Sequence, residues 1–258
     1  MLGGGAVVTG PAPMTAAGDP EGVVVAVVTP VYGNRDTLPE LVTRLDAALA
    51  GRRWRLRFVI DGSPDDSLTV ARDLAAADCR LAVTALAANV GQHRALTRGL
   101  ADEAGAGAWV CLDADLQDPP EAVPALLDRL AGGDVAAVFA GRRGSYESRG
   151  RSVTGRLHRR VLAGINGLPP DAGAFLALGP AARAAVVGLG GPSIVAAIGA
   201  SGLPVASVPV VRADRPTGRS AWTASARLAQ SGRTLAWAAR ARAHARAGRS
   251  HRWTTTTE

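Results

Sequence analysis

Short apolar runs alternate with helix patterns through the first half of this chain, and this alternation restricts the fold more than any other feature. Four runs have the length and residue types of buried strands: residues 23–28, 58–60, 81–86 and 109–112. After each run, apolar residues recur at helical spacing. Strands that alternate with helices of this length form right-handed βαβ units around a parallel sheet. The chain has 258 residues and 47% hydrophobic content, which is enough for one large α/β domain.

Two of the expected helices begin with a capping-box pattern. Thr37 precedes Glu40 by three positions, and Asp118 precedes Glu121 by three, with Pro119 at the first helical position. In a capping box the first side chain accepts a hydrogen bond from a backbone N–H of the first turn, and the later acid bonds back to it. The sequence therefore predicts helices that begin directly after Thr37 and Asp118.

Polar side chains follow the strand runs at the points where the strands are expected to end. Asp61 follows the second run, Asn89 the third, and Asp113 and Asp115 the fourth. The carboxyl ends of parallel strands meet at one edge of a sheet, and ligands bind in the crevice at that edge. Two carboxylates separated by one small residue can share Mg²⁺ or Mn²⁺ together with substrate phosphates. Taken alone, the pair is equally compatible with acids that only end a strand.

The charge of the chain predicts an anionic partner. All 29 basic residues are arginine, and the formal net charge is +7. The absence of lysine excludes a Walker-type phosphate loop. The partner could be nucleotide phosphates, nucleic acid or an acidic membrane surface. Arginines concentrate in residues 141–160 and 212–252, where they either bind phosphate groups or form a solvated basic surface.

Composition divides the chain into three expected segments. Residues 1–22 resemble a disordered tail, residues 23–221 form the α/β domain, and residues 222–258 form a basic helix and tail. The uncharged stretch 184–211 is long enough to span a bilayer, but glycines and prolines interrupt it. It is therefore predicted to form a helix, a turn and a buried strand over residues 205–211. The two cysteines indicate neither a disulfide framework nor a zinc site, which fits the cytoplasm.

Four blocks of residues occur in an order typical of a known family. They are Thr29-Pro30-Val31-Tyr32, Asp61-Gly62-Ser63-Pro64-Asp65, Asn89-Val90-Gly91-Gln92 and Asp113-Ala114-Asp115-Leu116-Gln117-Asp118-Pro119-Pro120-Glu121. Over residues 23–222 the chain resembles family 2 glycosyltransferases, and more narrowly the dolichol-phosphate mannosyltransferase branch, which includes bacterial polyprenyl-phosphate hexose synthases. The last block is the most specific. The resemblance implies an α/β fold of the GT-A type, with a Rossmann-like, mostly parallel sheet flanked by helices.

The same resemblance implies roles for individual residues. Asp61 would contact the nucleobase, Asp113 the ribose or sugar, and Asp115 with Gln117 would bind Mg²⁺ or Mn²⁺ on the diphosphate. The nucleotide-sugar site as a whole is expected to contain Pro30, Tyr32, Asp61, Asn89, Gly91, Asp113, Arg212, Arg215 and Ser220. The expected catalytic residues are Asp113, Asp115 and Asp171, and the expected acceptor-phosphate residues are Arg142, Arg143 and Arg156.

The resemblance implies a metal-dependent, inverting transfer of a hexose from a nucleoside-diphosphate sugar to polyprenyl phosphate. The enzyme would be cytoplasmic or peripheral on the cytoplasmic face of the membrane. A soluble hydroxyl acceptor, such as a secondary metabolite, is the alternative, and it would require a general base, for which Asp171 is the candidate. Four departures from the family pattern favour this alternative: Ile60, Ala88, Leu176 and Ala221, where polar or cationic groups are usual.

An arginine-rich nucleic-acid-binding protein without catalytic activity is the third interpretation. The basic charge permits it. The sequence contains no recognised nucleic-acid motif, and aromatic residues for base stacking are scarce in its basic segments. Nucleic acid is therefore not an expected partner.

Overall fold

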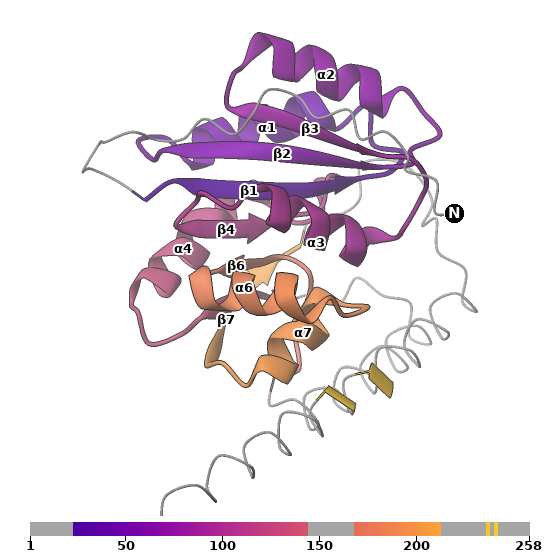
Figure 1. Ribbon diagram of the computed structural model, residues 1–258. Coiled ribbons are helices and arrows are strands. Elements are labelled where there is room, and N and C mark those ends of the chain that lie inside the picture. The colour runs from indigo at the N-terminus through magenta and orange to yellow at the C-terminus, as the bar shows by residue number, and fades with distance from the viewer. Residues whose placement is uncertain (1–22, 144–167, 213–235, 238–239, 242–258) are drawn as a thin grey trace, which may run out of the picture.

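A seven-stranded sheet forms the centre of the computed structural model, which describes residues 23–143, 168–212, 236–237 and 240–241 (Figure 1). The strand order is β3-β2-β1-β4-β6-β5-β7, and β6 alone among these strands is antiparallel to its neighbours. The strands are β1 Val25–Val31, β2 Trp54–Asp61, β3 Leu81–Leu86, β4 Ala108–Cys111, β5 Ala137–Arg143, β6 Leu176–Leu178 and β7 Val205–Val211. The mostly parallel sheet predicted from the sequence is confirmed.

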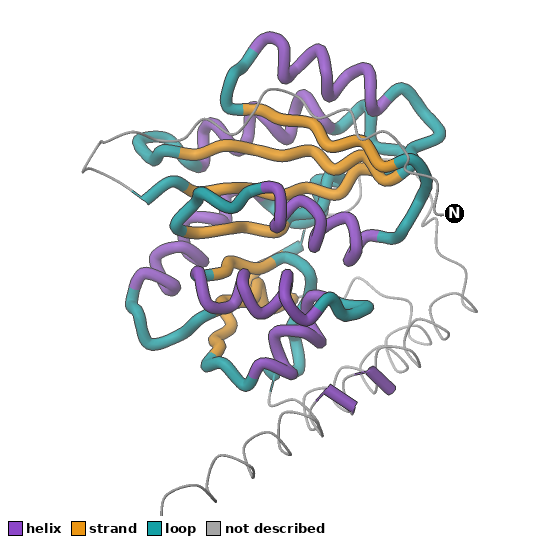
Figure 2. The backbone as a smooth tube through the Cα atoms, in the orientation of Figure 1, coloured by secondary structure: helices purple, strands orange, loops and turns teal. Residues whose placement is uncertain are grey.

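Helices cover both faces of this sheet (Figure 2). The helices α1, α2 and α4 pack on one face, and α3, α6 and α7 pack on the other, which is the near face in Figure 1. The helices are α1 Leu38–Ala48, α2 Ser67–Ala77, α3 Gln92–Asp102, the 3₁₀ turn η1 Pro120–Ala122, α4 Val123–Ala131, α6 Pro180–Leu189 and α7 Ile194–Ser201. The sheet is therefore the middle of three layers, and each βα unit places its helix on one outer layer.

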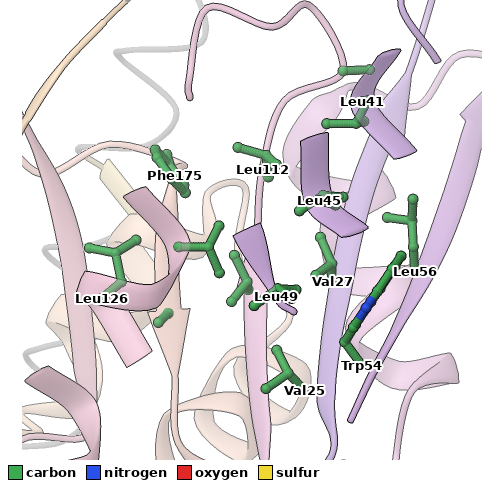
Figure 3. Close-up of a cluster of buried hydrophobic side chains, with 14 of the residues drawn as sticks. Val25, Val27, Leu41, Leu45, Leu49, Trp54, Leu56, Leu112, Leu126 and Phe175 are labelled. Atoms are coloured by element: carbon green, nitrogen blue, oxygen red, sulfur yellow. The ribbon is translucent and has the colours of Figure 1, made fainter. Parts of the chain in front are cut away.

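The two layers of core follow from the alternation of side chains along each strand. In β1, Val25 and Val27 point to one face and Ala26 and Val28 to the other, and all four are buried. Figure 3 shows the first layer, where Leu45 of α1 lies close to the β1 side chains. Each leucine buried in this way stabilises the fold by about 1.5–3 kcal/mol, so the apolar faces hold the helices on the sheet.

The strand β2 is longer than the predicted run 58–60, because its first half alternates apolar with charged residues. Arg55 and Arg57 occupy positions in β2 and both form ion pairs with the carboxylate of Glu103, which is 4% exposed. The Nε atom of Arg57 lies 2.7 Å from Glu103 Oε1. A run defined by hydrophobicity alone misses such a strand, since its charged positions are neutralised by a residue far away in the sequence.

The helix start predicted at Thr37 is confirmed, because α1 begins at Leu38, but neither predicted cap forms. The hydroxyl of Thr37 caps no backbone N–H of α1; it lies within hydrogen-bond distance of the carbonyl oxygens of Asn34 (3.0 Å) and Ala114 (2.6 Å). Asp118 does not cap a helix either, because the chain stays extended at Pro119 before η1 begins at Pro120. Both side chains instead connect segments that are distant in sequence.

The uncharged stretch 184–211 contains more turns than expected. It includes most of α6, the whole of α7 and β7, so one predicted helix is two. Among the described residues, no single helix is long and apolar enough to cross a membrane; α6 and α7 meet that requirement only jointly, and a bend of 111° separates them. The prediction of a buried strand at 205–211 is wrong in part, because β7 lies at the sheet edge and only Val210 in it is buried.

The predicted N-terminal tail, residues 1–22, lies outside the described residues, as does most of the predicted C-terminal helix. The described positions 236–237 and 240–241 are helical. Trp237 packs against the apolar layer under α6 and α7, and its ring contacts Gly191, where a side chain would clash with it. The segment after β7 therefore touches the domain through an aromatic side chain.

Candidate active site

The topology brings the predicted site residues to one edge of the sheet. β1, β2, β3, β4, β5 and β7 run in the same direction, so Asp61 at the end of β2, Asp113 after β4 and Arg212 after β7 lie beyond the same ends of their strands. Because β6 is antiparallel, residues that precede it, including Asp171, reach this edge from the opposite direction. The sequence predicts that the ends of β2, β3 and β4 lie at one edge of the sheet, and the structure confirms this prediction.

Asp61 is buried and organises the loop before α3. Its side chain accepts hydrogen bonds from the backbone N–H groups of Val90 (2.6 Å) and Gly91 (2.9 Å), and the residue is 3% exposed. The carboxylate thus lies at the N-terminus of α3, where the helix dipole favours negative charge. Pro30 lies within β1, Tyr32 is exposed directly after β1, and Asn89 is exposed in the loop itself. Gly91 forms the N-cap of α3 with φ +93°.

Side chains alternate between outside and inside along the turn that follows β4. Asp113, Asp115 and Gln117 are partly exposed, whereas Ala114, Leu116 and Asp118 between them are buried. Asp115 accepts a hydrogen bond from the backbone N–H of Gln117 at 3.1 Å. The turn therefore presents two carboxylates and one amide on its open side, while its other side is anchored in the protein.

Leu116 reveals how firmly this turn is held. It is the one residue other than glycine with a positive φ, +59°, among the residues described. Such a conformation costs about 1–3 kcal/mol in a bulky residue and persists only where the surroundings enforce it. Burial of the Leu116 side chain and the contact of the Thr37 hydroxyl with Ala114 provide that enforcement. The backbone is thereby turned so that Asp115 and Gln117 stay on the open side.

Two side chains from other elements position Asp113. The amide of Gln92, the first residue of α3, donates a hydrogen bond to Asp113 Oδ1 at 2.5 Å. From the other side, Nη2 of Arg212 lies 3.9 Å from Asp113 Oδ2. The Arg212 Nε also donates to Oδ1 of the buried Asp118, at 2.5 Å. Burial lowers the pKa of the Arg212 guanidinium, but the nearby charges of Asp118, Asp113 and Asp115 outweigh this and raise it, so Arg212 is cationic throughout the physiological range.

Asp171 lies next to Gly141 and Ser207, which come from β5 and β7. Its Oδ2 accepts a hydrogen bond from the Ser207 hydroxyl at 3.1 Å, and it approaches Gly141 so closely that any Cβ there would clash. Its Oδ1 is buried and has no hydrogen-bond partner within the described part of the chain. The Asp171 carboxylate is therefore fixed through Oδ2, while Oδ1 has no hydrogen-bond partner among the described residues.

Several predicted site residues cannot be placed at the level of side chains. Arg142 and Arg143 end β5 at the same edge of the sheet, and their side chains are not among those described. Arg156, Arg215 and Ser220 lie outside the described residues. Gln92, Asp118 and Thr37, by contrast, are site residues that sequence reasoning gave no role or a wrong one. Gln92 is the last residue of the family block that begins at Asn89, but nothing in the sequence indicated that its side chain contacts Asp113.

The available ligands fit a hard divalent cation that is shared with a substrate. In the described residues no group of three or more His, Cys, Asp and Glu side chains could hold a metal ion by itself. Asp115 and Gln117 offer oxygen ligands on the open side of the turn. Mg²⁺ and Mn²⁺ accept such oxygens and complete their coordination with phosphates and water. A cation here would therefore depend on a phosphate-bearing ligand.

His93, the second residue of α3, adds a pH-sensitive group to this region. Its Nδ1 atom is buried without a hydrogen-bond partner in the part of the chain that is described. Burial lowers the pKa of His93 from 6.5 to about 4. The imidazole is therefore neutral in the folded protein at neutral pH.

Acidification is expected to destabilise the fold through His93. Between pH 6.5 and 4 the unfolded chain binds a proton at this position that the folded chain does not, so stability falls as the pH decreases through this window. The loss from pH 7 to pH 5 should be about 2 kcal/mol. Urea denaturation at both pH values measures it. His93→Gln should remove this part of the pH dependence, and an unchanged pH dependence in that variant would contradict the assignment.

An open, mostly parallel sheet with carboxylates and a fixed arginine at the carboxyl ends of its strands is the arrangement in which α/β proteins of this class bind their ligands. The model of the Glycosyl transferase family 2 matches residues 26–176, which is more than half of the chain. The chain therefore belongs to this family, as its sequence motifs indicated.

Curated relatives support the same placement within the family. The chain is 36% identical over 147 residues to an undecaprenyl-phosphate 4-deoxy-4-formamido-L-arabinose transferase of Klebsiella pneumoniae subsp. pneumoniae, covering 55% of this chain and 44% of that protein. It is 41% identical over 113 residues to the enzyme of the same name from Pseudomonas paraeruginosa, covering 43% and 33%. The chain thus spans less than half of the length of these relatives. They belong to the polyprenyl-phosphate branch that the sequence resembled.

Solved structures confirm the GT-A fold. Glucosyl-3-phosphoglycerate synthase from Mycobacterium tuberculosis, solved with Mn²⁺ and UDP-glucose, superimposes with a TM-score of 0.63 at 20% identity, covering 84% of this chain and 78% of that one. The same enzyme solved with Mn²⁺, UDP and phosphoglyceric acid gives a TM-score of 0.61. At this level of identity the likeness concerns the fold.

Proposed function

We propose that this chain transfers a sugar from a nucleoside-diphosphate sugar to a polyprenyl phosphate at the cytoplasmic face of the membrane. One observation carries the proposal: Asp113, Asp115 and Gln117 share the open side of a rigid turn, and the cationic Arg212 lies beside them. Carboxylates for a cation together with a fixed arginine are what a departing diphosphate requires. The relatives named for undecaprenyl phosphate supply the acceptor class.

Asp115 and Gln117 would hold Mg²⁺ or Mn²⁺ on the donor diphosphate, where the ion neutralises the negative charge that develops on the leaving group. Crystals of the structural neighbour with Mn²⁺ and UDP-glucose support this choice of ion and donor. Arg212 would bind the same diphosphate from the β7 side, with Arg215 and Ser220. Asp61, Pro30, Tyr32, Asn89 and Gly91 would surround the nucleoside, and Asp113 the ribose or sugar.

The acceptor determines whether a general base is needed. The oxygen of a polyprenyl phosphate is already anionic, so it can attack the anomeric carbon directly from the face opposite the leaving diphosphate, with inversion. In that reaction Arg142, Arg143 and Arg156 would bind the acceptor phosphate, because arginine matches phosphate oxygens with two parallel hydrogen bonds. The basic segments of the chain would add contacts to anionic lipid headgroups.

A soluble hydroxyl acceptor is the second candidate. Asp171 favours it, because a buried carboxylate oxygen without a partner in the described residues is suited to take a proton from a hydroxyl group. The donor half of the reaction would be the same. Only the acceptor distinguishes the two candidates.

Transfer of a radiolabelled sugar tests the proposal. With Mn²⁺ and a panel of nucleoside-diphosphate sugars, label should move into the organic phase when polyprenyl phosphate is present, and EDTA should prevent it. Label that moves only onto a water-soluble acceptor would favour the second candidate. The proposal fails if no donor in the panel loses its sugar, with or without acceptor.

A further inference from the structure

Asp118 is a buried carboxylate that the reaction proposed above leaves without a role. It is 1% exposed, although its neighbours Gln117 and Pro119 are partly exposed. Its Oδ2 is buried and accepts no hydrogen bond from any described residue. The contact that offsets the charge of Asp118 is therefore made through Oδ1. A carboxylate without solvent is strongly unfavourable unless it is paired with a cation. The cation that pairs with Asp118 therefore explains how a carboxylate is tolerated at this buried position.

That partner, Arg212, comes from the far side of the sheet. It follows β7, the edge strand, which β5 and β6 separate from β4. The pair thus joins positions 94 residues apart in the chain. Val211 just before it is 67% exposed, whereas the Arg212 side chain is only 20% exposed because it turns toward the acidic residues after β4. Among the described residues, the carboxylate in direct hydrogen-bond contact with this side chain is that of Asp118.

The geometry of the contact leaves the end of the guanidinium available. Asp118 Oδ1 accepts from Nε, the inner nitrogen of Arg212, at 2.5 Å. The outer nitrogen Nη2 is directed to the acidic turn, 3.9 Å from Asp113 Oδ2. An arginine has five N–H donors in a rigid plane, so fixing the inner one orients the other four.

We propose that Asp118 is a positioning residue: it holds Arg212 by Nε so that the outer nitrogens face the donor diphosphate beside Asp113 and Asp115. This inference rests on the function proposed above. Without Asp118, a long side chain at the end of an edge strand must be ordered each time a diphosphate binds, and that ordering weakens binding. The same pair places a positive charge between three carboxylates and an anionic ligand, which reduces their repulsion.

If Asp118 had only a structural role, its loss would have a different effect on ligand binding, and Glu121 provides the comparison. It lies in the same connection, three residues after Asp118, and accepts two hydrogen bonds of 2.8 Å from Arg44 of α1. Its ion pair fastens the connection to α1 and does not involve Arg212. If Asp118 only fastened this connection, loss of the charge at Glu121 and loss at Asp118 would affect ligand binding alike.

Calorimetric titration with Mn²⁺ and UDP, GDP or dTDP in turn tests the proposal. Asp118→Asn should bind the diphosphate that the wild type prefers about tenfold more weakly or worse, and its affinity for the corresponding nucleoside should be unchanged. Glu121→Gln should bind the diphosphate within about twofold of the wild type. Arg212→Lys keeps the charge but has no Nε, so it should lose as much affinity as Asp118→Asn. This variant maintains the test if Asp118→Asn does not fold.

The effects of Asp118 and Arg212 should not add. In an Arg212→Gln background, Asp118→Asn should cause no further loss, because the group that Asp118 positions is gone. Equal binding by Asp118→Asn and the wild type, or an undiminished loss in the Arg212→Gln background, would overturn the inference alone. A wild-type chain that binds none of the diphosphates would overturn the proposed function and this inference together.

Discussion

Asp115→Asn should lower sugar transfer by about 10³-fold or more, while thermal unfolding stays close to that of the wild type. The carboxylate lies on the open side of the turn after β4 and accepts a hydrogen bond from the backbone N–H of Gln117. Asparagine keeps the size and one oxygen of this side chain, so the turn should still form. It removes the charge that holds a divalent cation, and loss of charge stabilisation at a leaving group typically reduces rates by this order.

The measurement is the initial rate of transfer over a range of Mn²⁺ concentrations, together with a thermal denaturation curve. Asp134→Asn serves as a control, because Asp134 is also an acid in a turn, exposed and paired with Arg129. It should change neither rate nor stability noticeably. Transfer by Asp115→Asn at a rate near the wild type, at saturating Mn²⁺, would remove Asp115 from the metal site.

The largest effect on stability is expected for Glu103→Ala. This buried carboxylate neutralises Arg55 and Arg57, both largely buried in β2, and its loss leaves two guanidinium groups without their partner. Breaking a buried ion pair by removing one member typically destabilises a protein by about 3–5 kcal/mol. Urea denaturation followed by circular dichroism should show a lower midpoint by the corresponding amount.

Asp128→Ala is the matched control for Glu103→Ala. Asp128 pairs with Arg52 at 2.6 Å on the surface, where both side chains are well exposed. Loss of an exposed pair typically costs less than about 1 kcal/mol. If the two variants unfolded at similar urea concentrations, burial would not be what makes the Glu103 network important.

The fold was predictable from the sequence because its signals are local. Short apolar runs followed by helical periodicity appear in the chain itself, and parallel βαβ units have one handedness. The same logic places Asp61 and Asp113 at one edge of the sheet from the sequence alone. The short strand β6 was not predictable in this way, because a three-residue strand carries little periodicity and its antiparallel direction depends on β4 and β5.

The candidate site was predictable in part. The residues on the open side of the turn, Asp113, Asp115 and Gln117, were found as a motif. Asp118 was interpreted as a helix cap, since an acid before two prolines has that local pattern. The structure gives it a buried ion pair with Arg212 instead. Local patterns could not reveal this contact because its partner lies 94 residues away.

The sequence by itself determined the class of fold, the edge of the sheet where polar groups gather and the family to which the chain belongs. These follow from periodicity, strand ends and a contiguous motif, all of which act over a few residues. Only the tertiary structure decided which side chains hold that motif in place: Thr37 at Ala114, Gln92 at Asp113 and Asp118 at Arg212. Each contact joins elements that meet only after the sheet has assembled, since hydrogen bonds between distant segments depend on packing that the local pattern of residues does not encode.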